Sequence, residues 1–531
     1  MKLLRLQGIG VDAQEQGKAR ARFLLRLALS LFAGIFAMFL SAPSSAAAAS
    51  NIYISQNGGG TGTSCSSASS VAWFNNSGNW GSGSAQIGPG TTVHLCGTFT
   101  GTAGQTLLTF QGSGTSGSPI TLLFESGANL TAPYWNGTDG AIYVNGLSYI
   151  TIDGGTNGTI QNTENGTGLA YEQPSAGVRV NNSSNVTIQN LTVANICQHT
   201  AVTDLTGCIQ GGNGDGGILI NGPAPNLLVT KNTVHDSENC IFYGGANGDT
   251  GVTISDNTVS RCNWGVGADQ SGTSSGFTVT GNDISQASNW DDANDGAFHH
   301  NGIMIFPQNG DVMNNVVIAN NYIHDINGHE TAHIFLDPSG TGDLPGVRVY
   351  NNVLTTTTGG GPANAFITDG AGVSGALVFN NTISGAGAQG ISGQVSPTFK
   401  NNIITGMTTG ISLNSGYTNV TSGSNDLSGL INTVTAGIDL DASSITGNPE
   451  LTSNYMLGPG SPAAGKGTNL TSLGITGLDT GAPQYFGISY ACGAGCQVRP
   501  STGPWDMGAY YQGSVVGNQP SPPTGLIATV Q

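Results

Sequence analysis

The chain has 531 residues, of which 84 are glycine, 13 are basic and 30 are acidic, for a net charge of −17. This balance argues against a nucleic-acid-binding protein, which needs a basic surface. Glycine is frequent without a collagen triplet, and Val, Ile and Leu recur at regular intervals, so a folded chain is expected rather than collagen or disorder.

Residues 1–49 have the pattern of a secretory signal. A basic stretch at 18–26 precedes the apolar run 27–40, and small residues follow up to Ala49, where we expect cleavage. The apolar run is shorter than the roughly 20 residues that cross a bilayer; an uncleaved signal anchor is the alternative. The rest of the chain keeps 7 basic and 28 acidic residues and contains no candidate membrane span. We therefore expect a strongly acidic protein, secreted or held at the cell surface.

All eight cysteines follow this segment. An even number in an oxidising compartment favours disulfides, and no zinc-ligand spacing is present. Loop closure favours pairs of sequence neighbours, with free buried cysteines as the alternative. The expected pairs are Cys65–Cys96, Cys197–Cys208, Cys240–Cys262 and Cys492–Cys496.

A repeated pair of short apolar strands is the most informative pattern. The first strand of each pair ends at an asparagine, and the shorter steps between these asparagines are 21–25 residues. Alternating apolar residues inside the strands and turn residues between them are typical of a stacked β-coil. We expect these asparagines to adopt the left-handed turn conformation and to hydrogen-bond from rung to rung. They are Asn190, Asn232, Asn257, Asn282, Asn321, Asn352, Asn381 and Asn402, with a weaker copy at Asn425.

The repeat lacks the leucine density of leucine-rich repeats and is shorter than a propeller blade, which leaves a parallel β-helix. Three features resemble the right-handed parallel β-helix repeat proteins of the pectate-lyase-like superfamily: the opening segments NIYISQNGGG and TTVHLCGTFTG, the V-x-I-x-N-N-x-I rungs, and the closing segments SPAAGKG and WDMGAY. The resemblance covers about residues 51–512 and implies an all-β, single-stranded solenoid. Its expected parts are an N-terminal cap with the first strands (50–110), the repeats (111–439), a C-terminal closing region (440–513) and a Pro-rich, disordered tail (514–531).

Two long steps in the repeat mark loops, at 197–217 and 286–302. From Asp291 to Asp337 the chain has seven acids and five of its eight histidines but no Lys or Arg. Such a cluster suggests a proton-transfer or cation site; a solvated acidic face is the alternative.

Aligning the second strands places Asp269, Phe306, Asp337 and Asp369 at comparable strand ends. Rungs about 4.8 Å apart would bring these carboxylates to separations that suit glycoside hydrolysis. We therefore predict Asp337, Asp369 and Asp269 as catalytic residues, with His333 on the same outer side by alternation. Ordinary turn chemistry is the competing interpretation of each aspartate.

Several side chains are weaker candidates. Trp264, Tyr243 and Phe335 could stack on sugars or simply pack. Residues 291–296, DDANDG, offer oxygen atoms to Ca²⁺ but do not follow the ligand pattern of an EF-hand loop. His235-Asp236 and His324-Asp325 recur in register, which favours structural turns. The substrate-binding candidates are His299, His300, Phe306, Trp290 and Arg348, and the candidate Ca²⁺ ligands are Asp291, Asp292 and Asp295.

The resemblance implies carbohydrate chemistry, since lyases, hydrolases, epimerases and noncatalytic adhesins share this scaffold. A lyase or epimerase must neutralise a uronate with Arg, Lys or Ca²⁺, yet few basic residues remain and an acidic protein repels an anionic polymer. We therefore favour hydrolysis of a neutral or weakly charged polysaccharide, although no Asn-Thr-Asp rung or Gly-His-Gly of the polygalacturonase type is present. A Ca²⁺-assisted lyase or epimerase and a noncatalytic binding protein are the alternatives. We expect a monomer with a polysaccharide partner, no nucleic-acid partner and no cofactor other than Ca²⁺.

Overall fold

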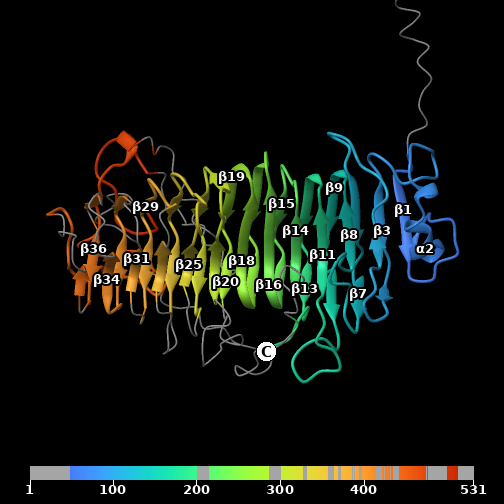
Figure 1. The fold of residues 1–531 in the computed structure, drawn as a ribbon, viewed down its shortest axis with the longest axis horizontal. Coiled ribbons are helices and arrows are strands. Elements are labelled where there is room, and N and C mark those ends of the chain that lie inside the picture. The colour runs from blue at the N-terminus through green and yellow to red at the C-terminus, as the bar shows by residue number, and fades with distance from the viewer. Residues whose placement is uncertain are drawn as a thin grey trace, which may run out of the picture.

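The computed structural model is a solenoid in which short parallel strands stack along one axis, from β1 (Asn51–Ser55) at one end to β36 (Asp426–Ser428) near the other (Figure 1). The fold is a parallel β-helix, as the repeat predicted. The structure describes residues 48–199, 208, 215–285, 300–326, 332–356, 364–368, 372–385, 387, 389–393, 398–413, 421–423, 425–430, 432–434, 442–473, 475 and 499–511.

The first sheet contains the strands that carry the V-x-I pattern. Each strand pairs in parallel with its counterpart on the next coil, so Ile188 lies beside Val229 and Val229 beside Ile254. Its members after β1 are β2 (Ser69–Ser70), β3 (Thr92–Leu95), β6 (Ile120–Phe124), β9 (Ser148–Asp153), β12 (Ser184–Gln189), β15 (Leu228–Thr230), β17 (Thr250–Ser255), β19 (Thr273–Thr280), β22 (Val312–Asn314), β23 (Val317–Ala319), β26 (Arg348–Tyr350), β29 (Leu377–Phe379), β32 (Thr398–Lys400) and β35 (Thr421–Gly423).

The second sheet follows the turn at each asparagine. Its strands are short, and on two coils they continue without a break into the third sheet as β16 (Thr233–Ala246) and β18 (Thr258–Ser271). The other members, besides β36, are β4 (Thr98–Thr100), β7 (Asn129–Ala132), β10 (Thr159–Asn162), β13 (Thr192–Ala194), β20 (Asp283–Ser285), β24 (Tyr322–His324), β27 (Val353–Thr355), β30 (Thr382–Ser384) and β33 (Ile403–Thr405).

The third sheet completes each coil and carries the predicted site. It combines the C-terminal halves of β16 and β18 with a row of separate strands. These are β5 (Leu108–Thr109), β8 (Ile142–Asn145), β11 (Ala176–Asn181), β14 (Gly216–Asn221), β21 (Asn301–Ile305), β25 (Ala332–Leu336), β28 (Asn364–Thr368), β31 (Gln389–Gly393), β34 (Thr409–Leu413) and β37 (Asn432–Val434).

The core is one continuous column of apolar side chains inside the coil. Alternate residues of each strand point inward, and Ile218, Ile241, Val266, Ile303 and Ile334 stack on successive rungs with no measurable exposure. One coil cannot enclose its own apolar face, so each rung is stabilised by its neighbours.

A buried asparagine ladder runs along the turn between the first and second sheets. From Asn232 onward, each side-chain amide donates to the Oδ1 of the asparagine on the next rung at 2.9 to 3.1 Å, and the ladder ends at Asn425. The predicted rung-to-rung hydrogen bonding is therefore confirmed.

The left-handed conformation falls one residue earlier than predicted. Lys231, Asp256, Asn320, Asn351, Asn380 and Asn401, each directly before a ladder asparagine, have φ between 54° and 60°. Asn190 shares this conformation, at φ 57°, so the alignment of Asn190 with Asn232 is wrong by one position. Leu191 takes the ladder position there, and its backbone N–H donates to Asn232 Oδ1 at 3.1 Å.

The N-terminal end of the core is closed by a short irregular segment containing η1 (Cys65–Ser67), α2 (Val71–Phe74) and η2 (Ser77–Asn79). The Ser70 hydroxyl accepts the Trp73 N–H at 3.1 Å and so caps α2. The Phe74 ring packs against Trp80 and Phe110 at centroid distances of 5.0 and 5.6 Å. These rings shield the first rungs from water.

The described part of the C-terminal region, which includes η4 (Thr471–Leu473), packs along the outer flank of the coil. Tyr510 contacts the cluster of Tyr322 and Val353, and Met507 packs in the cluster of Ile403. Arg499 anchors the segment: it is buried and donates to the carbonyl oxygens of Asp506 at 3.2 Å and Gly508 at 3.0 Å.

Three of the four predicted disulfides are present: Cys65–Cys96, Cys197–Cys208 and Cys240–Cys262. Cys492 and Cys496, residues 1–47 of the predicted signal and the tail 514–531 lie outside the described residues. Within the described ranges, no helix has the length and apolar character needed to cross a membrane.

Candidate functional site

The outer face of the third sheet brings the predicted acids into one row. Ala268 pairs with Ile305 and Ile305 with Leu336, so the next residues, Asp269, Phe306 and Asp337, share a position on three successive rungs. Backbone hydrogen bonds continue into this row, from Phe306 N–H to the Ala268 oxygen at 3.0 Å and from Asp337 N–H to the Ile305 oxygen at 2.9 Å. The register predicted for these three residues is confirmed, whereas Asp369 lies outside the described residues.

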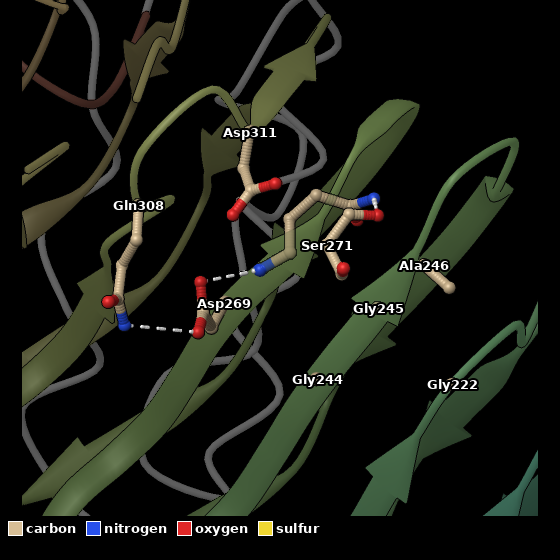
Figure 2. Close-up of a pocket in the computed structure, with 9 residues that line it drawn as sticks. Gly222, Gly244, Gly245, Ala246, Asp269, Ser271, Gln308 and Asp311 are labelled. Atoms are coloured by element: carbon tan, nitrogen blue, oxygen red, sulfur yellow. Dashed lines mark hydrogen bonds between the residues drawn. The ribbon is translucent and has the colours of Figure 1, made fainter. Parts of the chain in front are cut away.

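An open depression of about 520 Å³ lies beside Asp269 (Figure 2). Gly244 pairs with Asp269 and Gly245 with Gln270, so the neighbouring rung offers no side chains there. A Cβ at Gly245 would lie 2.3 Å from the Tyr243 hydroxyl, which explains why this position is glycine. The residues lining the depression are Gly222, Gly244, Gly245, Ala246, Asp269, Gln270, Ser271, Gln308 and Asp311.

Two carboxyl groups, from Asp269 and Asp311, border the depression (Figure 2). Asp269 accepts from the Gln270 backbone N–H at 2.7 Å and from the Gln308 amide at 3.4 Å. The Asp311 carboxylate accepts the Gly272 N–H at 2.6 Å. Burial raises the pKa of Asp269, and the negative charge of Asp311 raises it further against the opposing effect of the two hydrogen bonds.

An aromatic cluster borders the row of acids. The rings of Phe242, Trp264 and Phe306 lie on the outer side of the third sheet, with centroids 5.1 Å apart for Trp264 and Phe306 and 6.2 Å apart for Phe242 and Trp264. Trp264 and Phe306 remain partly exposed, whereas Phe335 is 8% exposed. Tyr243 was wrongly considered as a sugar platform, because it points into the core and its hydroxyl donates to Asp249 at 2.8 Å.

His333 does not share the outer side with Asp337, so this prediction is wrong. The regular alternation breaks at His333, which occupies an inward position taken on neighbouring rungs by Gly302 and Ala365. The imidazole is buried and its Nε2 donates to the Thr355 carbonyl oxygen at 2.9 Å. Burial lowers the pKa of His333 to about 4, which suits a neutral structural histidine.

The other predicted site residues are not gathered around the depression. Arg348 lies on β26 of the first sheet, a different face of the coil from Asp269. His300 is fully buried at the start of β21, at the opposite end of the strands from the depression. His299, Trp290, Asp291, Asp292 and Asp295 lie outside the described residues. In the described part of the chain, no group of three or more His, Cys, Asp or Glu side chains is arranged to hold a metal ion.

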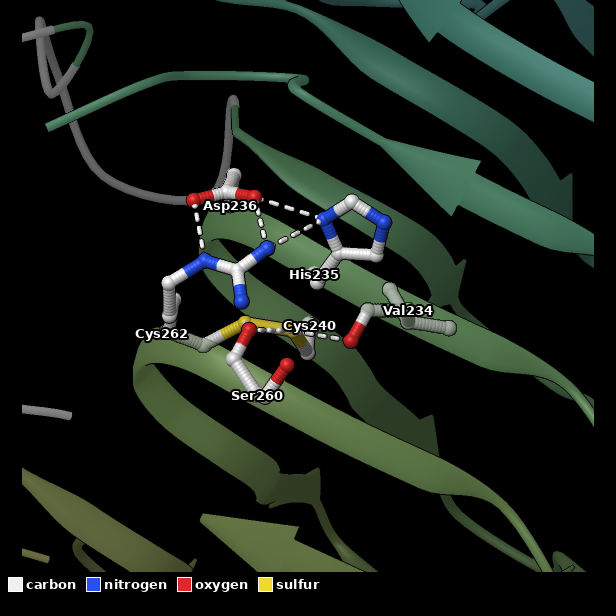
Figure 3. Close-up of polar contacts among 7 residues, drawn as sticks. Val234, His235, Asp236, Cys240, Ser260 and Cys262 are labelled. Carbon is white, nitrogen blue, oxygen red and sulfur yellow. Dashed lines mark hydrogen bonds and ion pairs between the residues drawn. A yellow bond between two sulfur atoms is a disulfide. The ribbon is translucent and has the colours of Figure 1, made fainter. Parts of the chain in front are cut away.

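The His-Asp pairs belong to turns, as favoured from the sequence. Asp236 and Asp325 both adopt left-handed backbone, with φ of 56° and 53°. The Asp236 carboxylate accepts from Arg261 at 2.8 Å and contacts the His235 ring at 2.6 Å (Figure 3). Burial raises the pKa of Asp236, but the hydrogen bonds from Arg261 and His235 outweigh it and hold that pKa below its usual value.

A second acid pair, not predicted from the sequence, lies at the N-terminal ends of two strands of the third sheet. Asp215 directly precedes β14 and Glu238 lies at the equivalent position of β16, since the following residues, Gly216 and Asn239, are paired. Burial raises the pKa of Glu238 to about 7. Burial and the charge of Glu238 raise the pKa of Asp215 well above its usual value. Aligning Gly216 with Asn239 in the sequence would have revealed this pair.

Comparisons with known proteins add little to this description. No protein-family model matches the chain, and no curated protein matches it in sequence. Among solved structures, pectate lyase Pel9A aligns with a TM-score of 0.43 and 17% identity over 88% of this chain and 98% of its own. XylC in complex with xylose aligns with a TM-score of 0.44 and 11% identity over 76% of this chain and 87% of its own. A tailspike protein of E. coli bacteriophage HK620 aligns with a TM-score of 0.38 and 10% identity over 67% and 70%. At these scores the fold assignment rests on the strand pairing itself.

Proposed function

We propose that this is an exported carbohydrate-active protein that binds a polysaccharide along the third sheet and hydrolyses it at the depression beside Asp269. The observation that carries the proposal is the pair of carboxyl groups, Asp269 and Asp311, at an open surface next to partly exposed aromatic rings. The three disulfides support export, because such bonds persist in oxidising compartments.

The two carboxyl groups have different surroundings, which suits them to different roles. Burial and a nearby negative charge favour the protonated form of Asp269, so it is proposed as the general acid that protonates the leaving oxygen. Asp311 is the neighbouring carboxyl group whose charge raises the pKa of Asp269, so it is proposed as the nucleophile or the base. Asp337 is two rungs from Asp269, about 10 Å at the usual rung spacing, and is the alternative partner of Asp269 in an inverting pair.

The lining of the depression favours a neutral substrate. It includes no Lys or Arg, so within the described residues a uronate carboxylate would meet two acids and no cation there. Removal of the proton beside a uronate carboxylate needs that charge to be neutralised. Glycoside hydrolysis is therefore proposed ahead of lyase or epimerase action.

The test is an assay of reducing-end release on a panel of neutral and acidic polysaccharides, with ultraviolet absorbance of unsaturated uronides followed in parallel. Asp269→Asn is expected to reduce hydrolysis at least about 100-fold with unchanged thermal unfolding. Comparing Asp311→Asn with Asp337→Asn identifies the partner, because only loss of the true partner abolishes turnover.

A noncatalytic binding protein is the second candidate, favoured by the aromatic cluster of Trp264 and Phe306. This function would be established if the wild type is retained by a polysaccharide in affinity electrophoresis but releases no reducing ends. The Asp269→Asn variant should then be retained to the same extent. Uronide absorbance that rises in step with new reducing ends would instead establish a lyase, because β-elimination also leaves one reducing end per cleavage.

A further inference from the structure

A row of polar residues lies where the second sheet turns into the third, at the opposite end of the strands from Asp269. Gly216 pairs with Asn239 and Asn239 with Trp264, so Asp215, Glu238 and Asn263 take equivalent positions on three successive rungs. Rungs are about 4.8 Å apart. Asn263 and Asp269 are separated by six residues of β18, or about 20 Å at the usual rise per residue. The row is therefore a location separate from the proposed active site.

The two acids of this row, one buried and one partly buried, lie without a counter-charge. Asp215 is 1% exposed and its carboxylate accepts the backbone N–H of Ser175. Glu238 is partly buried. Among the described residues, no Lys, Arg or His forms an ion pair with either carboxyl group, although Arg261 lies nearby in the chain and pairs with Asp236. Two ionised carboxylates in such a place are costly unless they take up protons, as the raised pKa values of both groups favour, or bind a cation.

Buried amide oxygens beside these acids also lack partners. Asn239 is 6% exposed and Asn263 is 4% exposed, and the Oδ1 atom of each has no hydrogen-bond donor. The Asn239 amide nitrogen donates to the Asp215 backbone oxygen at 3.3 Å, which holds the Asn239 side chain against Asp215. A buried amide oxygen without a partner costs about 1 to 3 kcal/mol, so a bound cation that accepts electron pairs from these two oxygens would remove that cost.

The Cys240–Cys262 disulfide holds the two rungs together at this level (Figure 3). Cys240 directly follows Asn239, and Cys262 directly precedes Asn263. The amide oxygens are thus carried by backbone that is fixed by a covalent cross-link as well as by strand pairing. A preorganised set of oxygen atoms loses less entropy when it binds an ion.

We propose that Asp215, Glu238, Asn239 and Asn263 bind one hard divalent cation, for which Ca²⁺ is the probe. The set offers only oxygen atoms, which Ca²⁺ prefers and which suit Zn²⁺ or Cu²⁺ poorly. Two carboxylates and two amide oxygens provide four to six ligands, and water completes the six to eight that Ca²⁺ requires. The cation cross-links β14, β16 and β18 at the corner of the coil and stabilises the folded state by mass action. This site is independent of the proposed catalytic function.

Thermal unfolding of the full exported chain, treated with EDTA and titrated with CaCl₂, tests the proposal. The midpoint is expected to rise with Ca²⁺ concentration in the wild type, as binding to the folded state requires. Glu238→Gln and Asn263→Ala are expected to remove most of this rise. Asp269→Asn, an acid on the same strand outside the row, should keep it.

Terbium luminescence gives a second readout because Trp264 lies next to Asn263 and can sensitise a bound lanthanide. Trp264→Phe should lose the sensitised emission and keep the Ca²⁺-dependent rise in the unfolding midpoint. Absence of any Ca²⁺ effect in the wild type, or a full effect in Glu238→Gln, would overturn the proposal. An effect lost in Asp269→Asn but kept in Glu238→Gln would place the cation at the depression instead.

Discussion

Replacing one asparagine of the ladder tests how much the stacked amides stabilise the coil. Asn321 is fully buried, and its amide nitrogen donates to the Val279 oxygen and to Asn352 Oδ1, each at 3.0 Å. Its Oδ1 accepts from both the backbone N–H and the side-chain amide of Asn282, again at 3.0 Å. Asn321→Ala therefore removes four hydrogen bonds at one point of the fold.

The size of the effect follows from the groups left behind. The Asn282 backbone N–H loses its acceptor, at about 1 to 3 kcal/mol for a buried unsatisfied group. The Asn282 side-chain amide loses less, because it still donates to the Ile254 oxygen at 3.0 Å. The deleted amide also leaves a small cavity, which adds to the cost. We therefore expect a loss of about 3 kcal/mol in the free energy of unfolding, within the range for broken buried networks.

Urea unfolding followed by circular dichroism and by tryptophan fluorescence measures this loss. Asn320→Gly is the matched control, because Asn320 lies outside the ladder and has φ of 57°, a conformation that glycine adopts readily. A loss below about 1 kcal/mol in Asn321→Ala, or one equal to that of the control, would show that the ladder does not stabilise the coil.

Two further substitutions test other parts of the fold. Burial raises the pKa of Asp426 from 3.8 to about 7, and neither carboxylate oxygen has a hydrogen-bond partner. The native state thus binds this proton more tightly than the unfolded state, so the stabilisation is present below pH 3.8 and lost as the pH rises through about 7. Asp426→Asn should therefore raise stability above pH 7 by at most about 4 kcal/mol and change little at pH 3.8; equal effects at both pH values would contradict this. A Cβ at Gly302 would lie 2.4 Å from the Ile323 side chain and 2.6 Å from the His333 oxygen, so Gly302→Ala should lower the unfolding midpoint, while Gly59→Ala, which meets nothing within 4 Å, should not.

The sequence predicted the coil well because a solenoid repeats its local chemistry. Alternating apolar residues recur along the coil, and the structure uses the recurring asparagine on the rungs from Asn232 to Asn425. The misaligned Asn190 shows where prediction from the repeat fails. Asn tolerates left-handed backbone and also forms ladders, so a single asparagine near the turn, such as Asn190, does not reveal which of the two adjacent positions it occupies.

The sequence predicted only the part of the candidate site whose position depends on strand register alone. Asp269 and Asp337 were placed in one row because each follows the same apolar pattern. His333 was misplaced because the alternation breaks one residue before Ile334, and this irregularity leaves no mark in the sequence. Asp311 was not paired with Asp269 because it comes from an irregular turn 42 residues further along, whose path no repeat describes.

The arrangement of the third sheet explains why acids gather at both ends of its strands. From β14 to β25, the middle positions either point into the stacked core, as Ile303 does, or carry mostly apolar outer side chains such as Phe242 and Met304. A charge in the core would disturb every neighbouring rung, because side chains there contact their equivalents above and below. The strand ends are free of this constraint, so Asp269 at one end and Glu238 at the other can each approach an acid carried by another rung or turn. A β-helix therefore separates the rows that hold the fold together from the edges where carboxyl groups are available for binding or catalysis.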